Sequence, residues 1–306
     1  MEILTISGGS GLFGEVRIPG AKNSVLPIMA ASVLCRGTVT LTDVPHLSDV
    51  EASARILQSV GCKVLLENGR AVITPPEFPG SAVPEPLMRA MRSSLFYLAP
   101  LLARTGRADI YTPGGCRLGA RPIDMHLSGL EKMGAHIMEK DGGALEVTAP
   151  DGLAGADICL RFPSVGATET LLMAAAAARG ETVLRGAAVE PEVTDLARFL
   201  QGAGADITGV GTRVLHIRGR ELLMGTQHAV CPDRITAATV LCAVAGCSPI
   251  PATPIWPRCC ASCAGPDAWC RPRGTALWRW QARALCAPRE GGIRACIHRS
   301  QRTRHP

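Results

Sequence analysis

Hydrophobic and polar positions repeat along the first 250 residues of the chain with a spacing of about 70 residues. Three segments share one order, which is an apolar helix end, a glycine that ends the helix and a β-strand; they are 57–65, 130–138 and 200–208. A helix rich in Ala, Leu or Met precedes each segment, and a turn and a further strand follow it. Because three such units must bury their helical faces against one another, the pattern predicts a compact α/β domain with pseudo-threefold symmetry.

The repeat also places individual helices and strands. Helices are expected over 25–37, 94–106 and 168–180. Short strands are expected over 38–41, 109–111 and 182–184, and the outer hairpin strands over 70–74, 144–148 and 213–217. A fourth unit begins at Pro232 with a helix over 235–246, but the next strand and helix of the unit do not follow.

The segment 248–306 differs from the rest of the chain in composition. It holds ten arginines, six of the 13 cysteines and all four tryptophans, without a helical or strand period. A disordered basic extension explains the arginines but not the tryptophans and cysteines. We therefore favour translation of GC-rich coding sequence in a shifted reading frame, and we expect an unfolded tail. The predicted domains are first strands of an incomplete second domain (1–19), a complete repeat domain (20–230), the start of the second domain (231–247) and the tail (248–306).

Composition and charge narrow the class of protein. Hydrophobic residues make up 47% and charged residues 19%, which is typical of a globular chain. Without an 18-residue apolar run or a signal sequence, a cytoplasmic protein that does not cross a membrane is expected. The net charge of +6 comes from the tail, which argues against a nucleic-acid partner for the repeated part. The seven cysteines before residue 248 have no CxxC spacing, which favours a reducing compartment and no metal site.

The loop 111–126 holds the residues that indicate chemistry. A Pro-Gly-Gly turn precedes Cys116, and Arg117 and Arg121 follow it. Neighbouring cations stabilise a thiolate, and a guanidinium donates two parallel hydrogen bonds to a phosphate or carboxylate. A lone cysteine is more often a small buried apolar residue. The combination of a fixed turn, a thiol and two arginines favours an anion-handling, cysteine-based enzyme site.

Three helix starts share this preference for anions. Lys22 and Asn23 precede the first helix, Arg92 occupies the equivalent place in the second unit, and residues 164–166 occupy it in the third. The N–H groups and the dipole at a helix N-terminus favour anions. Each position alone is more often a solvated surface residue. Their recurrence at matching places predicts that the helix N-termini converge on one ligand region.

Six motifs follow one another in the repeated part of the chain. They are G-A-K-N at 20–23, M-R-x-S at 91–94, P-G-G-C-x-x-G-x-R-P-x-D-x-H at 113–126, P-S-V-G-A-T at 163–168, E-P-E-V-x-D at 190–195 and P-D-R-I at 232–235. Together they resemble the UDP-N-acetylglucosamine 1-carboxyvinyltransferases, the enolpyruvyl transferases of peptidoglycan synthesis. The likeness runs from about residue 3 to residue 246. The sister family that makes enolpyruvylshikimate phosphate shares the repeats but lacks the cysteine loop.

The resemblance implies two inside-out α/β barrels, each of three βαβαββ units, with the active site between them. It implies transfer of enolpyruvyl from phosphoenolpyruvate to the 3'-hydroxyl of UDP-N-acetylglucosamine, the first committed step of peptidoglycan synthesis, without metal or organic cofactor. Cys116 matches the proton donor, which forms a covalent adduct with phosphoenolpyruvate and is the target of fosfomycin. Lys22, Asn23 and Arg121 match contacts to phosphoenolpyruvate. The positions that match contacts to the UDP-sugar are Arg92, Arg121, Pro122, Ile123, Asp124, Met125, Ser164, Val165 and Gly166.

The resemblance also has a limit that leaves two hypotheses open. In the family the second barrel supplies an aspartate base and further arginines, and only the start of that barrel is recognisable here. One hypothesis is an enzyme by lineage, whose partners are the two small-molecule substrates. The alternative is a non-catalytic single-barrel remnant with impaired substrate binding. A basic nucleic-acid-binding protein is a third reading, but it rests on the tail alone, and the oligomeric state stays open.

Overall fold

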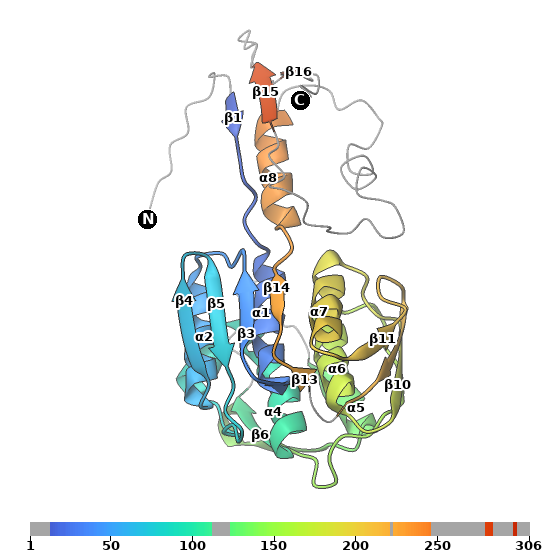
Figure 1. Cartoon of the computed structure of the whole chain (residues 1–306). Helices are drawn as coiled ribbons and strands as arrows, with labels where there is room; N and C mark the ends of the chain where they lie inside the picture. The colour runs from blue at the N-terminus through green and yellow to red at the C-terminus, as the bar shows by residue number, and fades with distance from the viewer. Residues whose placement is uncertain (1–12, 112–122, 221–222, 246–278, 284–295, 299–306) are drawn as a thin grey trace. The chain divides into compact units, whose positions relative to one another are not determined.

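The computed structural model describes residues 13–111, 123–220, 223–245, 279–283 and 296–298 (Figure 1). The chain divides into two compact units, one of residues Gly20–Cys231 and one that joins Met1–Pro19 to Pro232–Pro306. Most of the described residues belong to Gly20–Cys231, which we call the repeat domain.

Three copies of one α/β unit make up the repeat domain. The first contains α1 (Lys22–Ala31), the 3₁₀ helix η1 (Ser32–Leu34), β2 (Cys35–Arg36), β3 (Val39–Thr42), α2 (Ser48–Ser59), β4 (Lys63–Glu67) and β5 (Arg70–Thr74). The second contains α3 (Glu85–Ala90), η2 (Arg92–Tyr97), α4 (Leu98–Thr105), β6 (Arg107–Tyr111), α5 (Asp124–Lys132), β7 (His136–Lys140), η3 (Asp141–Gly143) and β8 (Ala144–Thr148). The third contains β9 (Asp157–Cys159), α6 (Val165–Ala177), β10 (Glu181–Arg185), α7 (Pro191–Gly202), β11 (Asp206–Thr208) and β12 (Val214–Arg218). The three predicted repeats are confirmed.

The sheets of the three units have the same strand order. The third unit has its full set, β11-β12-β10-β9, with β9 parallel to β10. In the second unit, β6-β8-β7, a single parallel bridge from Ala82 to Asp109 takes the place of β9. In the first unit that place is filled from the far end of the domain, because β14 (Gln227–Ala229) pairs in parallel with β3. The first unit is therefore completed by residues that follow the third.

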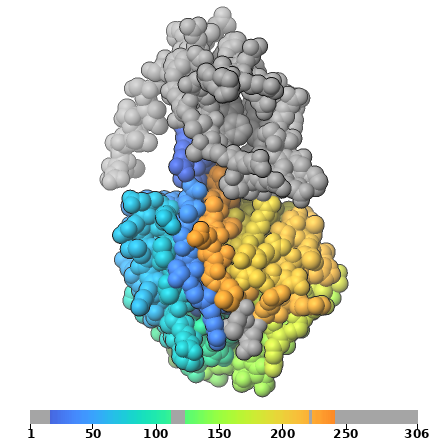
Figure 2. Space-filling view, in the orientation of Figure 1, coloured from blue at the N-terminus to red at the C-terminus, as the bar shows by residue number. Residues whose placement is uncertain are grey.

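The segment after the third unit returns along the first. Its strand β13 (Leu223–Met224) pairs in parallel with β2, and β14 extends the first sheet to the order β14-β3-β5-β4. Figure 2 shows this return segment, coloured orange, between the blue first unit and the yellow third unit. The three sequence repeats thus form a closed succession of units.

Helices occupy the interior of the repeat domain and sheets cover it. Every residue of α1 from Ser24 to Ala31 is buried, and so is every residue of α6 from Ala167 to Ala176. Helices without an exposed polar face belong in a core, because one apolar stripe is enough for a surface helix. The strands alternate instead, as in β5, where Ala71 and Ile73 are buried and Arg70 is exposed. This inside-out arrangement of three units is the predicted fold.

The central helices begin about three residues earlier than their apolar pattern predicts. Lys22, Arg92 and Val165 open α1, η2 and α6, so the polar motif residues form first turns. Polar side chains suit this position because the first N–H groups of a helix have no intrahelical acceptor. In the second unit the helix is also divided into η2 and α4, and Pro100 stands in the first turn of α4.

The second compact unit has four described elements. They are β1 (Phe13–Glu15), α8 (Arg234–Ala245), β15 (Arg279–Arg283) and β16 (Cys296–His298). The helix α8 lies at the predicted place. The strands β15 and β16 lie in the tail, where the sequence pattern predicts no strand, and β15 pairs with β1 and with β16. Backbone groups alone make such pairs, so they need no alternating side chains. None of the described helices has the length and hydrophobicity that crossing a lipid bilayer requires.

Candidate functional site

The predicted site residues divide between described and undescribed parts of the chain. Cys116, Arg121 and Pro122 lie outside the described residues, so the central cysteine loop contributes no geometry. The other predicted positions all lie in the repeat domain, at or next to the start of a helix; they are Lys22, Asn23, Arg92, Ile123, Asp124, Met125, Ser164, Val165 and Gly166.

His126 brings three of these helix starts together. It is the third residue of α5, only 8% exposed, and its Nδ1 lies 2.9 Å from Oγ1 of Thr170 on α6. Its ring covers Gly166, where a Cβ atom would lie 3.2 Å from the ring atom Cε1. Burial lowers the pKa of His126 to about 4, and the positive charge of Arg92 acts in the same direction, against Asp124. The starts of α5, α6 and η2 therefore form one group around a neutral imidazole.

Two local interactions fix the edges of this group. Ser164 is the N-cap of α6, and its side chain accepts a hydrogen bond from the amide of Ala167 at 3.4 Å. Asp124, the first residue of α5, forms an ion pair with Arg161 just before α6. Close packing also suits glycine at position 166, since a Cβ atom there would require the histidine ring to move by a few tenths of an ångström. The segments 123–126 and 164–166 are thus held against each other.

Lys22 and Asn23 lie at the start of α1. Their side chains are half-buried and exposed respectively, and Nζ of Lys22 forms an ion pair with Asp49 on α2. Gly20 allows this placement, because a Cβ atom there would lie 1.9 Å from the carbonyl oxygen of Asp43. A larger residue at position 20 would push the chain away from β3 and move the start of the helix.

Helix α7 connects the start of α1 to the start of α6. Ser24 on α1 donates a hydrogen bond to Asp195 on α7. Glu192, in the first turn of α7, and Glu190, just before it, act electrostatically on Glu169 of α6. Each of these five residues lies near the N-terminal end of its helix. The starts of α5 and η2, from the second unit, meet the start of α6 at His126. The helix starts of all three units therefore lie at one end of the repeat domain.

Both positive groups and carboxyl groups lie at this end of the repeat domain. The converging helix dipoles, Lys22 and Arg92 favour anions. Glu169 is only 1% exposed, and its Oε1 accepts no hydrogen bond from the described residues. Burial and the charges of Glu192 and Glu190 raise its pKa well above the ordinary value. A protonated Glu169 adds no negative charge, so the end of the domain can still bind an anionic ligand.

Glu169→Gln is expected to stabilise the protein at high pH. The raised pKa means that folding keeps a proton on Glu169 which the unfolded chain loses above pH 4.5, so stability falls as the pH rises toward the folded pKa. Glutamine cannot ionise, and each pKa unit is worth about 1.4 kcal/mol. Urea unfolding should show equal stability at pH 4.5 and a more stable variant at pH 8. The exposed Glu181→Gln is the matched control, and an equal pH response of the variant and the wild type would contradict the prediction.

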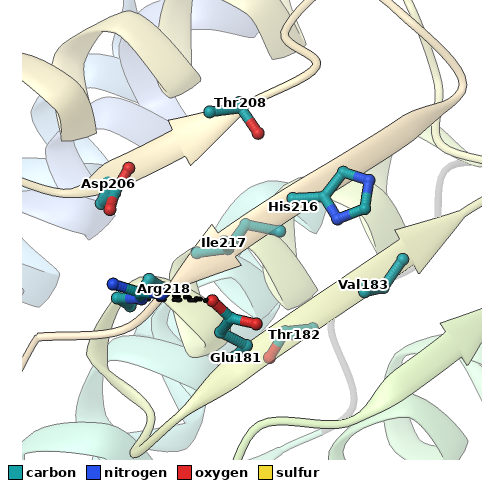
Figure 3. Close-up of a pocket in the computed structure, with 8 residues that line it drawn as sticks. All are labelled: Glu181, Thr182, Val183, Asp206, Thr208, His216, Ile217 and Arg218. Carbon is teal, nitrogen blue, oxygen red and sulfur yellow. Dashed lines mark hydrogen bonds and ion pairs between the residues drawn. The ribbon is translucent and has the colours of Figure 1, made fainter.

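A separate hollow of about 210 Å³ lies on the exposed face of the third sheet (Figure 3). Its lining residues come from β10, β11 and β12, and Glu181 forms an ion pair with Arg218 across it at 2.7 Å. None of the predicted site residues lines this hollow. It is the solvent-facing side of a sheet rather than part of the convergent helix starts. Within the described ranges there is also no cluster of three or more His, Cys, Asp or Glu residues that could hold a metal ion.

The sequence pattern alone assigned no function to His126, Glu169 and Asp195. All three are polar and buried, and each joins two helix starts. His126 and Asp195 each stand at the end of one of the six motifs. A polar residue at a fixed place in a motif was therefore the signal in the sequence that could have indicated them. Glu169 follows P-S-V-G-A-T directly, in a helix that is otherwise apolar or small. A lone glutamate in such a helix indicates a buried carboxyl group, which must be hydrogen-bonded or protonated.

Solved structures with the same fold define the class of this chain. The enolpyruvyl transferase NikO from Streptomyces tendae matches 77% of this chain and 56% of its own length, with a TM-score of 0.69 and 25% identity. An EPSP synthase from Acinetobacter baumannii matches 78% of this chain and 54% of its own, with a TM-score of 0.61 and 24% identity. The repeat domain therefore has the inside-out α/β fold of the enolpyruvyl transferases.

Sequence comparison gives the family. The sequence model of the EPSP synthase (3-phosphoshikimate 1-carboxyvinyltransferase) family matches residues 6–247, and the chain belongs to that family. Relatives at higher identity carry the name UDP-N-acetylglucosamine 1-carboxyvinyltransferase. One from Carboxydothermus hydrogenoformans is 49% identical over 241 residues, and one from Rhodospirillum centenum is 47% identical over 256 residues. These matches cover 79% and 80% of this chain but 57% and 59% of the relatives. The resemblance carried by the six motifs is confirmed.

Proposed function

We propose that the repeat domain binds phosphoenolpyruvate and UDP-N-acetylglucosamine for enolpyruvyl transfer to the 3'-hydroxyl of the sugar. In a bacterium that makes peptidoglycan, this is the first committed step of cell-wall synthesis. The observation that carries the proposal is the group around His126, which joins Arg92, Asp124 and Gly166. These positions come from three of the six motifs that carry the resemblance, and a relative 49% identical to this chain is named UDP-N-acetylglucosamine 1-carboxyvinyltransferase. A cytoplasmic location and the small-molecule partners belong to the same proposal.

The residues divide into two binding roles. Lys22, Asn23 and Arg121 hold the phosphate and carboxylate of phosphoenolpyruvate. The UDP-sugar lies against the starts of η2, α5 and α6, where converging N–H groups and Arg92 suit a diphosphate. Its contacts are Arg92, Arg121, Pro122, Ile123, Asp124, Met125, Ser164, Val165 and Gly166. A neutral His126 next to Gly166 keeps the two loops in contact without adding charge.

Cys116 is the proposed proton donor. The sugar oxygen bonds to C2 of phosphoenolpyruvate and loses its proton to a base, while the thiol gives its proton to C3. Phosphate then leaves C2 and C3 loses a proton, so that the enol ether forms and the thiol is restored. The cationic side chains stabilise the negative charge on the phosphate and carboxylate groups. The thiol form is required, so Arg117 and Arg121 must not lower its pKa too far.

The length of the match favours a second candidate function. The chain spans about 57% of the length of the curated relatives it matches, and residues 248–306 lie beyond the family match. A base for the sugar hydroxyl is absent from the predicted site residues. The repeat domain would then bind substrates weakly and not turn over, as a single-barrel remnant of the enzyme.

A steady-state assay separates the two functions. The full chain is incubated with both substrates, and released phosphate is measured. Turnover that Cys116→Ser abolishes supports the transferase. Absence of turnover, together with calorimetric binding of UDP-N-acetylglucosamine and fosfomycin labelling of Cys116, supports the remnant. A folded chain that shows neither turnover, binding nor labelling contradicts both, and Cys159→Ser, an exposed thiol outside the site, is the matched control.

A further inference from the structure

The motif E-P-E-V-x-D at 190–195 supplies none of the proposed substrate contacts, yet its last residue has a defined place in the repeat domain. Asp195 on α7 is 6% exposed and accepts three hydrogen bonds from two other segments. Its Oδ2 accepts from the hydroxyl of Ser24 and, at 3.0 Å, from the amide of Cys231. Its Oδ1 lies 3.0 Å from Nε2 of His228 on β14. A buried carboxylate with this many donors holds whatever it binds in one position.

Both ends of the repeat domain meet at this carboxylate. Ser24 lies just after the chain enters the domain, and Cys231 is its last residue. The carbonyl oxygen of Cys231 also accepts a hydrogen bond from the amide of Ala21 at 2.7 Å. The peptide groups of Cys231 therefore bridge the start of α1 to Asp195. Figure 1 shows α1, β14 and α7 as neighbours, in agreement with their packing.

Lys22 and Asn23 lie between two of these anchors. Ala21 on one side is bound to Cys231, and Ser24 on the other side is bound to Asp195. The side chain of Ser24 is fully buried, whereas Lys22 and Asn23 reach the surface. Helix α1 has no side-chain N-cap of its own, so Asp195 and Cys231 supply its fixation from outside the helix.

The carboxylate is also suited to remain charged. Burial by itself would raise the pKa of Asp195, but the hydrogen bonds from His228, Ser24 and the Cys231 amide hold it below its ordinary value. The ring of Phe199 stands edge-on to His228, with 5.8 Å between the ring centroids, and limits where the imidazole can move. Asp195 is therefore a rigid acceptor across the neutral pH range.

We propose that Asp195 is a positioning residue, which through Ser24 and Cys231 sets the place of Lys22 and Asn23 for an anionic ligand. It touches no substrate itself. The inference rests on the proposed function only in naming phosphoenolpyruvate as that ligand. It deepens the proposal, since the start of α1 depends on residues more than 170 positions away in the sequence.

The test uses the lysines of the full-length chain. There are four, and Lys63, Lys132 and Lys140 are exposed and distant in sequence from α1. The chain is acylated with N-hydroxysuccinimidyl acetate, and the rate at each lysine is read by peptide mass spectrometry. The rate at Lys22 is divided by the rate at Lys63, and the measurement is repeated over a range of phosphoenolpyruvate concentrations. The variants are Ser24→Ala, Asp195→Asn and the double variant, and the exposed Asp206→Asn is the matched control.

Phosphoenolpyruvate is expected to protect Lys22 in the wild type and in Asp206→Asn. Both single variants should need roughly tenfold more ligand for half-protection, the effect of losing one hydrogen bond to a charged group. The double variant should add little to either single variant, because both changes remove the same bond. Ser24→Ala keeps two of the three hydrogen bonds of Asp195, so it decides the test if Asp195→Asn does not fold.

One outcome would overturn the positioning role of Asp195, and a different outcome would overturn the choice of phosphoenolpyruvate as the ligand. Unchanged half-protection and an unchanged Lys22 to Lys63 ratio in folded Ser24→Ala overturn the positioning role. Failure of phosphoenolpyruvate to protect Lys22 in the wild type overturns the proposed ligand instead. In that case the ratio without ligand still decides on Asp195, because a displaced α1 start changes the surroundings of the Lys22 amine and an unmoved one does not.

Discussion

Lowering the pH from 8 to 5 is expected to cost this protein about 2 kcal/mol of unfolding free energy through His126 alone. The folded pKa of His126 is about 4, below the ordinary value of 6.5. Between these values the unfolded chain binds a proton that the folded chain excludes, so stability is complete above pH 6.5 and falls toward pH 4. Protonation would place a positive charge beside Arg92, inside the packed starts of α5 and α6.

His126→Asn measures this contribution. The asparagine amide can replace Nδ1 in the bond to Thr170 but does not titrate, so the variant should lose the acid-side slope and keep its fold at pH 7. Urea unfolding at half-unit pH steps gives the slope. The exposed His216→Asn on β12 is the matched control, and it should behave as the wild type does. Parallel pH curves for His126→Asn and the wild type would show that His126 is not the titrating group.

Arg92→Ala is expected to weaken binding of UDP-N-acetylglucosamine by about 10- to 100-fold, the range for loss of a charge-assisted hydrogen bond. The half-buried guanidinium acts on His126 and stands at the start of η2, among the converging helix starts. Calorimetry of the full chain gives the dissociation constant. The same variant should raise the pKa of His126, because the positive charge that lowers it is gone.

Arg218→Ala is the matched control for this experiment. Arg218 is exposed and paired with Glu181 on the outer face of the third sheet, so its loss should change neither measurement. Unchanged affinity in Arg92→Ala would remove Arg92 from the proposed binding site. A shift of the His126 pKa without a change in affinity would keep the two side chains together but place the sugar nucleotide elsewhere.

Much of the fold could be predicted because its signals are local. The Gly that ends each helix and the alternation in the strands lie within a few residues of the elements they define, and the strands over 70–74 and 144–148 were placed at their observed bounds. The return of β14 to β3 could not be predicted in this way. That pairing joins residues about 187 positions apart, and a three-residue strand carries no period of its own.

The candidate site was predicted in part, for a related reason. Lys22, Arg92 and Gly166 were identified because charged residues and glycines at helix starts indicate anion binding. The residues that hold these helix starts in place were not identified. The sequence alone does not distinguish a buried carboxyl group, such as that of Glu169 or Asp195, from a solvated one. Only the packing shows that Asp195 faces the entry and exit of the domain and that Glu169 faces two other carboxylates.

The hydrogen bond between Ala21 and Cys231 has a consequence for how the domain could have arisen and how it can be rebuilt. The two ends of the repeat domain are adjacent, and its first unit is completed by its last strand, so the fold does not depend on the point in this cycle of units at which the chain begins. Joining residue 231 to residue 20 by a short linker and opening the chain in the exposed segment 211–213 would leave every strand pair of the repeat domain intact. The domain is topologically a ring, in which the position of the termini is a matter of gene history rather than of packing.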